Sequence, residues 1–266
     1  MQRLVVWALI MSLAGCASNG RRIDRMAESA GLTRSLVEAD GYRSLIYMQR
    51  GRAADDSALI VFLEGDGRPW NGPQPSSDPT TGKPVALQLL LQTPRAAAYI
   101  TRPCYQGLQG NRCTPEQWTG ARYSEEIITS MAAAVREAAR RAERPEVVLV
   151  GYSGGGALAV LIAERLDNVA AVITLAANLD IDAWTTSRHF LPLSQSLNPA
   201  ASERNHPWPE LHLHGARDTI VPVSTTTAYF QRHANARQRI IDDYDHVCCW
   251  IDRWPTLFQE IEQSLQ

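Results

Sequence analysis

The sequence predicts one α/β domain built on a doubly wound, mostly parallel sheet, with a small lid-like insertion. Short apolar runs of strand length alternate along the chain with segments of helical periodicity. This order is typical of parallel sheets covered by helices on both faces. The chain has 266 residues, of which 45% are hydrophobic and 20% charged. That composition is typical of a globular domain and not of a fibre or a disordered tail.

The expected strands are apolar runs. The clearest is residues 58–63, whose unbroken Ala-Leu-Ile-Val-Phe-Leu sequence indicates a strand buried on both faces. The expected strands are 44–49, 58–63, 97–101, 146–150, 169–175, 210–214 and 237–241. The expected helices are 84–91, 123–141, 154–166, 223–233 and 250–263. Residues 65–84 and 102–120 are rich in turn-forming residues, which predicts loops, and 178–208 is expected to be the irregular insertion.

The start of the chain has the pattern of a secretion signal. A short basic start is followed by an apolar run at 4–13, which is shorter than a membrane-spanning helix. The run ends in Leu13-Ala14-Gly15-Cys16, which resembles a bacterial lipobox, whose cysteine becomes the lipidated first residue. We therefore expect a signal peptide at 1–15, a lipidated tether with a short helix at 16–43, and the folded domain at 44–266. The lipobox resemblance, with Ala17 after the cysteine, implies an outer-membrane anchor facing the periplasm.

Export would place the other four cysteines in an oxidising compartment, where an even number predicts disulfides. These cysteines are Cys104, Cys113, Cys248 and Cys249. The favoured pairing closes a short loop between Cys104 and Cys113 and joins Cys248 to Cys249. The two crossed pairings, which would tie the middle of the chain to its end, remain open at this point.

Charge and composition argue against several classes of function. The net charge is −2, so the chain has no basic field to hold a nucleic-acid backbone. Lys83 is the only lysine and lies in a predicted loop, which disfavours Schiff-base chemistry. His212 and His214 alternate on an expected strand, but such a pair without nearby acids is more often structural than metal-binding. We expect no nucleic-acid partner, no metal and no cofactor.

The first candidate for chemistry is the sequence Gly151-Tyr-Ser153-Gly-Gly155, which follows an expected strand and opens an expected helix. This context is that of the G-x-S-x-G nucleophile elbow. The turn is so tight that side chains two residues before and after the serine would collide, and glycine removes both collisions. Ser153 would then project above the sheet at a helix N-terminus, whose amides can stabilise an oxyanion.

The second candidate is Asp218, in the sequence Asp-Thr-Ile-Val-Pro after the expected strand at 210–214. An aspartate at such a position is a candidate for the acid of a catalytic triad. Asp180 and Asp182, which follow the preceding strand, are its rivals. Asp218 is favoured over these rivals, although a turn aspartate can also serve as a cap.

The third candidate is His246, which lies between the last expected strand and the last expected helix. It is the only histidine at such a junction. His233 is expected in the middle of a helix, exposed to solvent. His189 and His206 lie in the insertion, where they could contact substrate, although an exposed loop histidine is the simpler interpretation.

An oxyanion hole is expected at the turn Glu64-Gly65-Asp66, after the buried strand, with the N–H groups of Asp66 and Gly154 as its donors. Two carboxylates beside a developing oxyanion are unfavourable unless they point away or are paired. Arg68 and Arg102 are the candidate partners for such a pair.

From about residue 44 to its end, the chain resembles the α/β-hydrolase superfamily. The resemblance rests on the elbow and on the aspartate and histidine loops, in the order Ser153, Asp218, His246 that this superfamily has. Three segments are similar to those of a subgroup of bacterial exported lipoproteins, namely 151–156, Ser196-Leu-Asn-Pro199 and Cys248-Cys-Trp250.

This resemblance implies acyl transfer to Ser153, with His246 as the base and Asp218 orienting the imidazole. The expected substrate is a small-molecule or lipid acyl compound joined through a carboxylic ester or thioester, and the membrane is contacted through an anchor at Cys16. Two alternatives remain open. One is a non-catalytic envelope lipoprotein that uses the fold for binding, and the other is a peptidase or amidase of the same fold. The oligomeric state is not predicted.

Overall fold

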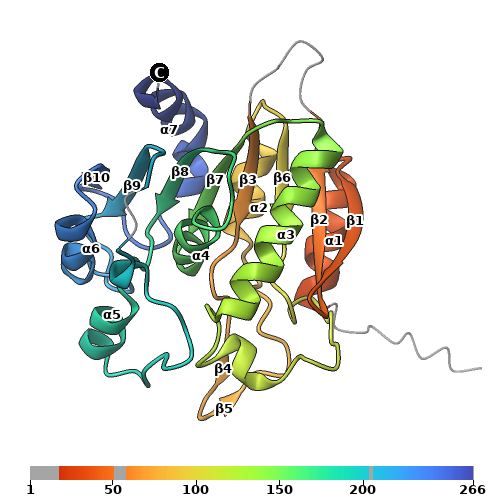
Figure 1. Ribbon diagram of the computed structural model, residues 1–266, viewed down its shortest axis with the longest axis horizontal. Coiled ribbons are helices and arrows are strands. Elements are labelled where there is room, and N and C mark those ends of the chain that lie inside the picture. Colours follow the sequence, from red (N-terminus) through yellow and green to blue (C-terminus); the bar gives the residue numbers. More distant parts are fainter. Residues whose placement is uncertain (1–17, 51–57, 204–205, 266) are drawn as a thin grey trace, which may run out of the picture.

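The computed structural model describes residues 18–50, 58–203 and 206–265. Eight strands form its main sheet: β1 (Thr33–Ala39), β2 (Tyr42–Gln49), β3 (Leu59–Leu63), β6 (Ala97–Ile100), β7 (Val147–Tyr152), β8 (Val169–Leu175), β9 (Glu210–Gly215) and β10 (Ala236–Ile241). Their order is β1-β2-β6-β3-β7-β8-β9-β10 (Figure 1). β2 is antiparallel to both of its neighbours, and the pairs from β6 to β10 are parallel. The predicted mostly parallel α/β fold is confirmed.

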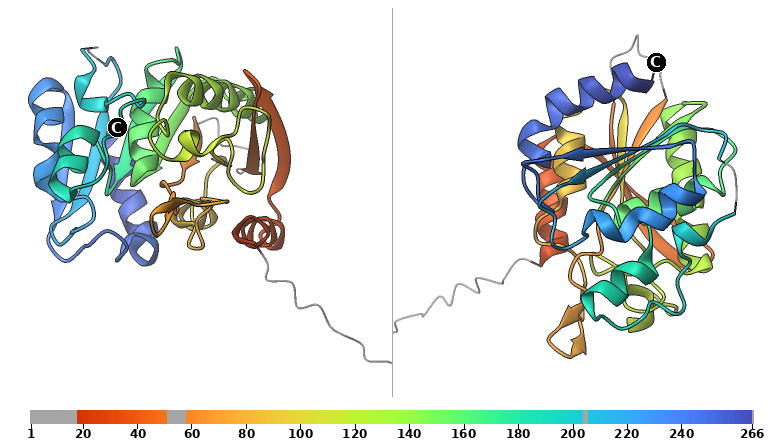
Figure 2. Two further views of the ribbon diagram at one scale, coloured as in Figure 1. Left: turned by 90° about the horizontal axis from the view of Figure 1, so that it is seen from below. Right: turned by 90° about the vertical axis from the view of Figure 1, so that its left-hand side faces the viewer.

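Helices cover both faces of the sheet (Figure 2). On one face lie α3 (Glu125–Ala142), α4 (Gly154–Ala163) and α6 (Thr227–Arg232). On the other face lie α1 (Asn19–Ser29), α2 (Val85–Leu91) and α7 (Trp250–Leu265). Successive side chains of a strand point to opposite faces of the sheet, so each strand packs against both helix layers. In β3, Leu59, Val61 and Leu63 face the first set of helices, and Ile60 and Phe62 face the second. This double burial explains the unbroken apolar sequence of β3.

The structure adds elements that the sequence pattern did not predict. Strand β1 occupies part of the expected tether and pairs with β2 through the two-residue turn Asp40-Gly41, where both residues have positive φ. Within the expected irregular insertion lies α5 (Ile181–Arg188), which begins at the cap residue Asp180. The expected loop after β3 contains a small hairpin of β4 (Trp70–Asn71) and β5 (Gln74–Pro75). The described residues also form three 3₁₀ helices: η1 (Pro115–Trp118), η2 (Pro199–Ala201) and η3 (Val223–Thr226).

The connections that follow the parallel strands meet at one edge of the sheet, which we call the carboxyl edge. The β4–β5 hairpin follows β3, and α5 follows β8, so both lie at this edge, at the lower end of Figure 1. In open parallel sheets the carboxyl ends of the strands are where ligands bind. The topology therefore directs the search for a functional site to these connections.

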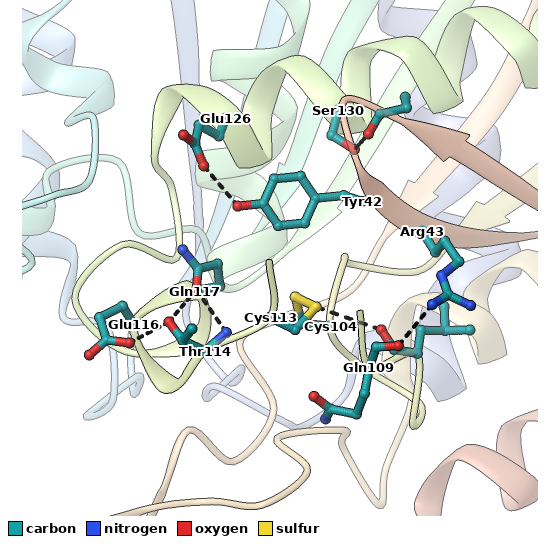
Figure 3. Close-up of a disulfide and its surroundings, with 12 residues drawn as sticks. Tyr42, Arg43, Cys104, Gln109, Cys113, Thr114, Glu116, Gln117, Glu126 and Ser130 are labelled. Atoms are coloured by element: carbon teal, nitrogen blue, oxygen red, sulfur yellow. Dashed lines mark hydrogen bonds between the residues drawn. A yellow bond between two sulfur atoms is a disulfide. The ribbon is translucent and has the colours of Figure 1, made fainter. Parts of the chain in front are cut away.

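Both cysteine pairs are in the favoured arrangement. Cys104 is joined to Cys113 with a Cα–Cα distance of 5.4 Å, and Cys248 is joined to Cys249. Figure 3 shows the first disulfide below the side chain of Tyr42, which donates a hydrogen bond to Glu126 of α3. This disulfide closes the loop that follows β6 and so constrains its position over the sheet.

Replacing both Cys104 and Cys113 with serine should lower the free energy of unfolding by about 2–3 kcal/mol, because the unfolded chain regains the entropy of a short closed loop. Urea unfolding of the full chain, with and without the substitutions, measures this loss. An unchanged unfolding midpoint would contradict the stabilising role of this bond.

Within the described ranges, no helix is long and apolar enough to cross a membrane. The expected signal peptide and the lipidation site at Cys16 lie outside the described residues.

Candidate functional site

Ser153 lies at the turn between β7 and α4, with φ of 52° and ψ of −125°. A side chain at Gly151 would collide with the backbone of Gly155, and one at Gly155 would collide with the carbonyl of Leu63. The glycines therefore allow Ser153 to adopt a positive φ and allow the strand and the helix on either side of it to pack closely. The Ser153 N–H donates to the Leu175 carbonyl of β8 at 2.8 Å, which ties the elbow to the neighbouring strand.

His246 reaches the elbow from the connection between β10 and α7. Its Nε2 lies 3.0 Å from the Ser153 Oγ. The backbone carbonyl of His246 accepts hydrogen bonds from the Tyr152 hydroxyl at 2.8 Å and from the Trp250 indole at 3.1 Å. Tyr152, which precedes the serine, and Trp250, the first residue of α7, thus fix the main chain at His246.

Asp218 completes the arrangement from the connection after β9. Its Oδ2 lies 2.8 Å from the His246 Nδ1, and its side chain is 1% exposed. The other oxygen, Oδ1, accepts the N–H groups of Ile220 and Val221, both at 2.8 Å. The carboxylate therefore has the capping contacts expected of a turn aspartate as well as the contact to histidine.

The rival acids face elsewhere. Asp180 caps α5 by accepting the N–H groups of Asp182 and Ala183. The side-chain amide of Asn198 donates to both Asp180 and Asp182 at 2.9 Å. These hydrogen bonds hold the start of the insertion and leave Asp218 as the acid in contact with His246.

The turn after β3 lies against the elbow. A Cβ placed on Gly65 would come within 3.3 Å of the Ser153 Cβ, so the backbone of this turn lines the space beside the serine. The buried Glu64 side chain points away from that space: its two oxygens accept the N–H groups of Gly65 at 3.2 Å and Ala86 at 3.1 Å. Burial raises the pKa of Glu64 to about 7, against the opposing effect of these backbone donors.

Asp66 is paired rather than isolated. Arg102 Nη2 lies 2.6 Å from its Oδ1, and Arg122 Nη1 lies 2.8 Å from its Oδ2. The Tyr123 hydroxyl also donates to this carboxylate at 2.7 Å. Burial alone would raise the pKa of Asp66, but the two guanidinium groups lower it to about 2. Of the two candidate partners from the sequence, Arg102 is correct, whereas Arg68 donates to Asn71 instead.

Arg122 and Tyr123 are the residues at this site that the sequence pattern did not predict. Both lie shortly before Ser124, the cap residue of α3, in a segment without a recognisable motif, so only the fold brings them to Asp66. The carboxylate of Asp66 packs against Gly154, where any side chain would collide with it and with the Tyr123 hydroxyl. One aspartate and two arginines therefore place a net positive charge next to the first residue of α4.

Three further histidines, His206, His212 and His233, contact residues other than Ser153. His206 is buried, with Nδ1 2.5 Å from Glu210 Oε1 and Nε2 3.1 Å from Glu164 Oε1. His212 Nε2 lies 3.0 Å from Glu210 Oε2, and its Nδ1 lies 2.8 Å from the Thr174 Oγ1. An acid therefore does lie beside this histidine, contrary to the premise drawn from the sequence. The expectation that His233 is solvated was wrong: it is buried at the end of α6 and stacks on the His206 ring at 5.0 Å.

Burial lowers the pKa of His206, but Glu164 and Glu210 outweigh this and raise it to about 9. Because the folded-state pKa lies above the unfolded value, the resulting stability is fully present below about pH 6.5 and is lost as the pH rises through about 9. Between these limits the free energy of unfolding should fall by about 2–3 kcal/mol.

Urea unfolding at about pH 6 and about pH 9.5 tests this dependence. The His206→Gln variant should lose this part of the pH dependence, whereas His189→Gln, at an exposed position, should keep it. An identical pH dependence in His206→Gln and the wild type would contradict the charged state of His206.

Within the described part of the chain, no group of three or more His, Cys, Asp or Glu side chains is placed to hold a metal ion.

A surface hollow of about 390 Å³ is not part of the site; it lies among Met48, Ala96 and Arg144. These residues end β2 or precede β6 and β7, so the hollow opens at the edge of the sheet opposite Ser153.

Solved structures share this fold. Est1E from Butyrivibrio proteoclasticus superimposes with a TM-score of 0.61 at 14% identity, covering 87% of this chain and 98% of that one. The esterase PF2001 of Pyrococcus furiosus gives a TM-score of 0.63 at 14% identity, covering 90% and 91%. A bacterial membrane phospholipase A gives 0.60 at 14% identity, covering 92% and 91%. No curated protein matches the chain.

Fold and comparisons together define an α/β-hydrolase-type serine hydrolase. The family model described as Serine hydrolase (FSH1) matches residues 102–248, more than half of the chain. The chain belongs to this family. The matched range includes Ser153, Asp218 and His246, and it begins after the turn that carries Asp66.

Proposed function

We propose that this serine hydrolase cleaves carboxylic esters or thioesters through a triad of Ser153, His246 and Asp218. The observation that carries the proposal is the continuous hydrogen-bonded chain from the serine Oγ to the His246 imidazole and on to the buried Asp218 carboxylate. A nucleophile, a base and a group that orients the base, each within hydrogen-bond reach of the next, form the arrangement that acyl transfer requires.

In this mechanism His246 Nε2 accepts the Ser153 proton as Oγ attacks the acyl carbon. The same nitrogen then donates that proton to the leaving alkoxide or thiolate, and an acyl-serine remains. Water, deprotonated by His246, releases the acid and restores Ser153. Asp218 keeps Nδ1 protonated and stabilises the imidazolium that forms during both steps.

The tetrahedral oxyanion would be stabilised by two backbone N–H groups. Gly154 is the first residue of α4, so its N–H has no partner within the helix. Asp66 supplies the second donor from the turn that lines the elbow. The ion pairs of Asp66 support this assignment, because its carboxylate is neutralised and the net charge beside Gly154 is positive.

We also propose that the enzyme acts at the bacterial cell envelope, held by acyl chains on Cys16 and facing the periplasm. The support is the lipobox resemblance at 13–16 and the even number of cysteines after it. A substrate with an acyl chain, free or in a lipid, fits an enzyme anchored in this way.

Hydrolysis of p-nitrophenyl esters of increasing acyl length, and of matched acyl thioesters, tests the activity. The wild type should hydrolyse at least one of these series and Ser153→Ala none. A matched series of acyl amides separates the alternatives: faster turnover of amides would favour an amidase, and no turnover of any series by the folded, oxidised protein would favour a binding role.

A further inference from the structure

The exposed apolar side chains of this protein gather at the carboxyl edge. Within the described residues, seven large apolar side chains are exposed. Two of them, Leu36 and Ile240, lie on the strands β1 and β10. The other five, which we call the apolar rim, are Trp70, Phe190, Leu191, Ile220 and Val247. Exposed apolar residues gathered in one region mark an interaction surface more often than scattered ones do.

Topology places the rim at the same edge of the sheet as the serine. Trp70 follows β3 in the β4–β5 hairpin, and Phe190 and Leu191 follow α5, after β8. Ile220 lies two residues beyond Asp218, and Val247 directly follows His246. Each of these connections leaves the carboxyl end of a parallel strand, so the five residues lie at the edge of the sheet where β7 ends and Ser153 begins the turn into α4. Leu191 is the most exposed member of the rim, at 73%.

The chain enters the fold at the same edge. The Asn19 side chain, in the first turn of α1, donates to the Thr80 carbonyl at 2.8 Å, in the connection after β3. The backbone of Gly20 packs against Gln106, in the connection after β6. Any attachment that precedes α1 therefore holds the protein by its carboxyl edge.

Basic side chains accompany this entry point. Arg21 and Arg22 of α1 are exposed, as are Arg68 and Lys83 in the connection after β3. Basic residues beside an apolar surface are attracted to anionic lipid headgroups. An apolar rim with neighbouring basic residues and a chain entry at the same edge fits a lipid bilayer better than a second protein.

We infer that the apolar rim docks on an anionic phospholipid bilayer, so that the mouth of the Ser153 site faces the membrane. This inference rests on the proposed function in one respect, since it assigns the bilayer as the surface from which an acylated substrate enters. Docking itself needs no catalysis, so it is measured in a Ser153→Ala background.

The test uses the full chain bound to vesicles of phosphatidylcholine and phosphatidylglycerol whose acyl chains carry bromine, which quenches nearby tryptophan. Bromine should quench the fluorescence, and Trp70→Phe should remove a clear part of that quenching. Trp208→Phe, which lies before β9 and stacks on His206, should leave the quenching unchanged. Vesicles without phosphatidylglycerol should bind less protein, because the basic side chains then lack anionic partners.

A second comparison tests the rim as a unit. The double variant Phe190→Ser/Leu191→Ser should lose most of the quenching of Trp70, whereas Leu36→Ser/Ile240→Ser should retain it. Vesicle-bound protein in which Trp70 is not quenched would overturn the inference, since the site would then face water. Failure to bind vesicles would overturn it as well, and esterase activity in the wild type would show separately whether the proposed function holds.

Discussion

The variant His246→Ala is expected to lose about 10⁴-fold or more in kcat/KM for the ester on which the wild type is most active. Among the residues that the structure describes, only the His246 imidazole hydrogen-bonds to both Ser153 Oγ and Asp218, so its loss removes the proton acceptor. The fold should survive, because Tyr152 and Trp250 bond to the carbonyl of residue 246, which the variant keeps. Steady-state kinetics with circular dichroism as a check on folding measures the effect.

The matched control is His189→Asn, an exposed histidine that ends α5 in a left-handed conformation, which asparagine also accepts. Its kcat/KM should stay within a few-fold of the wild type. A His246→Ala enzyme that keeps more than about a tenth of the activity would contradict the role of His246 as the base.

The variant Asp66→Asn should lower the free energy of unfolding by about 3–5 kcal/mol, because removing one partner leaves buried charge uncompensated. Arg102 and Arg122 would share a neutral partner, and the side chain of Arg102 is 3% exposed. The Arg102 guanidinium would then have no other carboxylate within 4.0 Å among the described residues. Urea unfolding, together with the kcat of the folded fraction, measures the two consequences.

The control is Glu260→Gln, which removes a surface ion pair with Arg239 whose side chains are both 45% exposed. Such a pair contributes at most about 1 kcal/mol. Adding Arg122→Leu to Asp66→Asn should recover part of the lost stability, since one uncompensated charge is removed. Equal losses of unfolding free energy in Asp66→Asn and Glu260→Gln would contradict the claim that the Asp66 carboxylate compensates the buried charges of Arg102 and Arg122.

The sequence predicted the residues that meet at the site because each carries a local signal. The glycines around Ser153, the strand before it and the helix after it form a motif, and Asp218 and His246 follow strands in a fixed chain order. The parallel sheet then brings three separate strand ends together. Apolar runs such as 58–63 also carry a local signal, since a strand that is buried on both faces has an unbroken apolar sequence.

Other features depend on contacts that are distant in sequence. Arg122 has no motif, and its role arises only because α3 packs against the sheet near Asp66. His206 was expected to be an exposed loop histidine. It lies in a loop but is buried, in contact with Glu164, which is 42 residues before it in the chain. Helix α5 is short and partly polar, so its periodicity was too weak to detect.

One missed element did have a local signal. Asp40-Gly41 is among the strongest two-residue signals for a tight hairpin, because both positions need positive φ. It lies between β1 and β2, in register with Ala39 opposite Tyr42. The exposed, polar sequence of β1 concealed the strand, since an edge strand lacks the apolar alternation of a buried one.

Covalent labelling of the purified, oxidised full chain with a fluorophosphonate tests the central claim most directly. This probe reacts with serines that a neighbouring base activates. The account predicts a single adduct, located on Ser153 by peptide mass spectrometry, which is absent in Ser153→Ala and strongly reduced in His246→Ala. An unlabelled wild type, or an adduct on another residue, would contradict the triad.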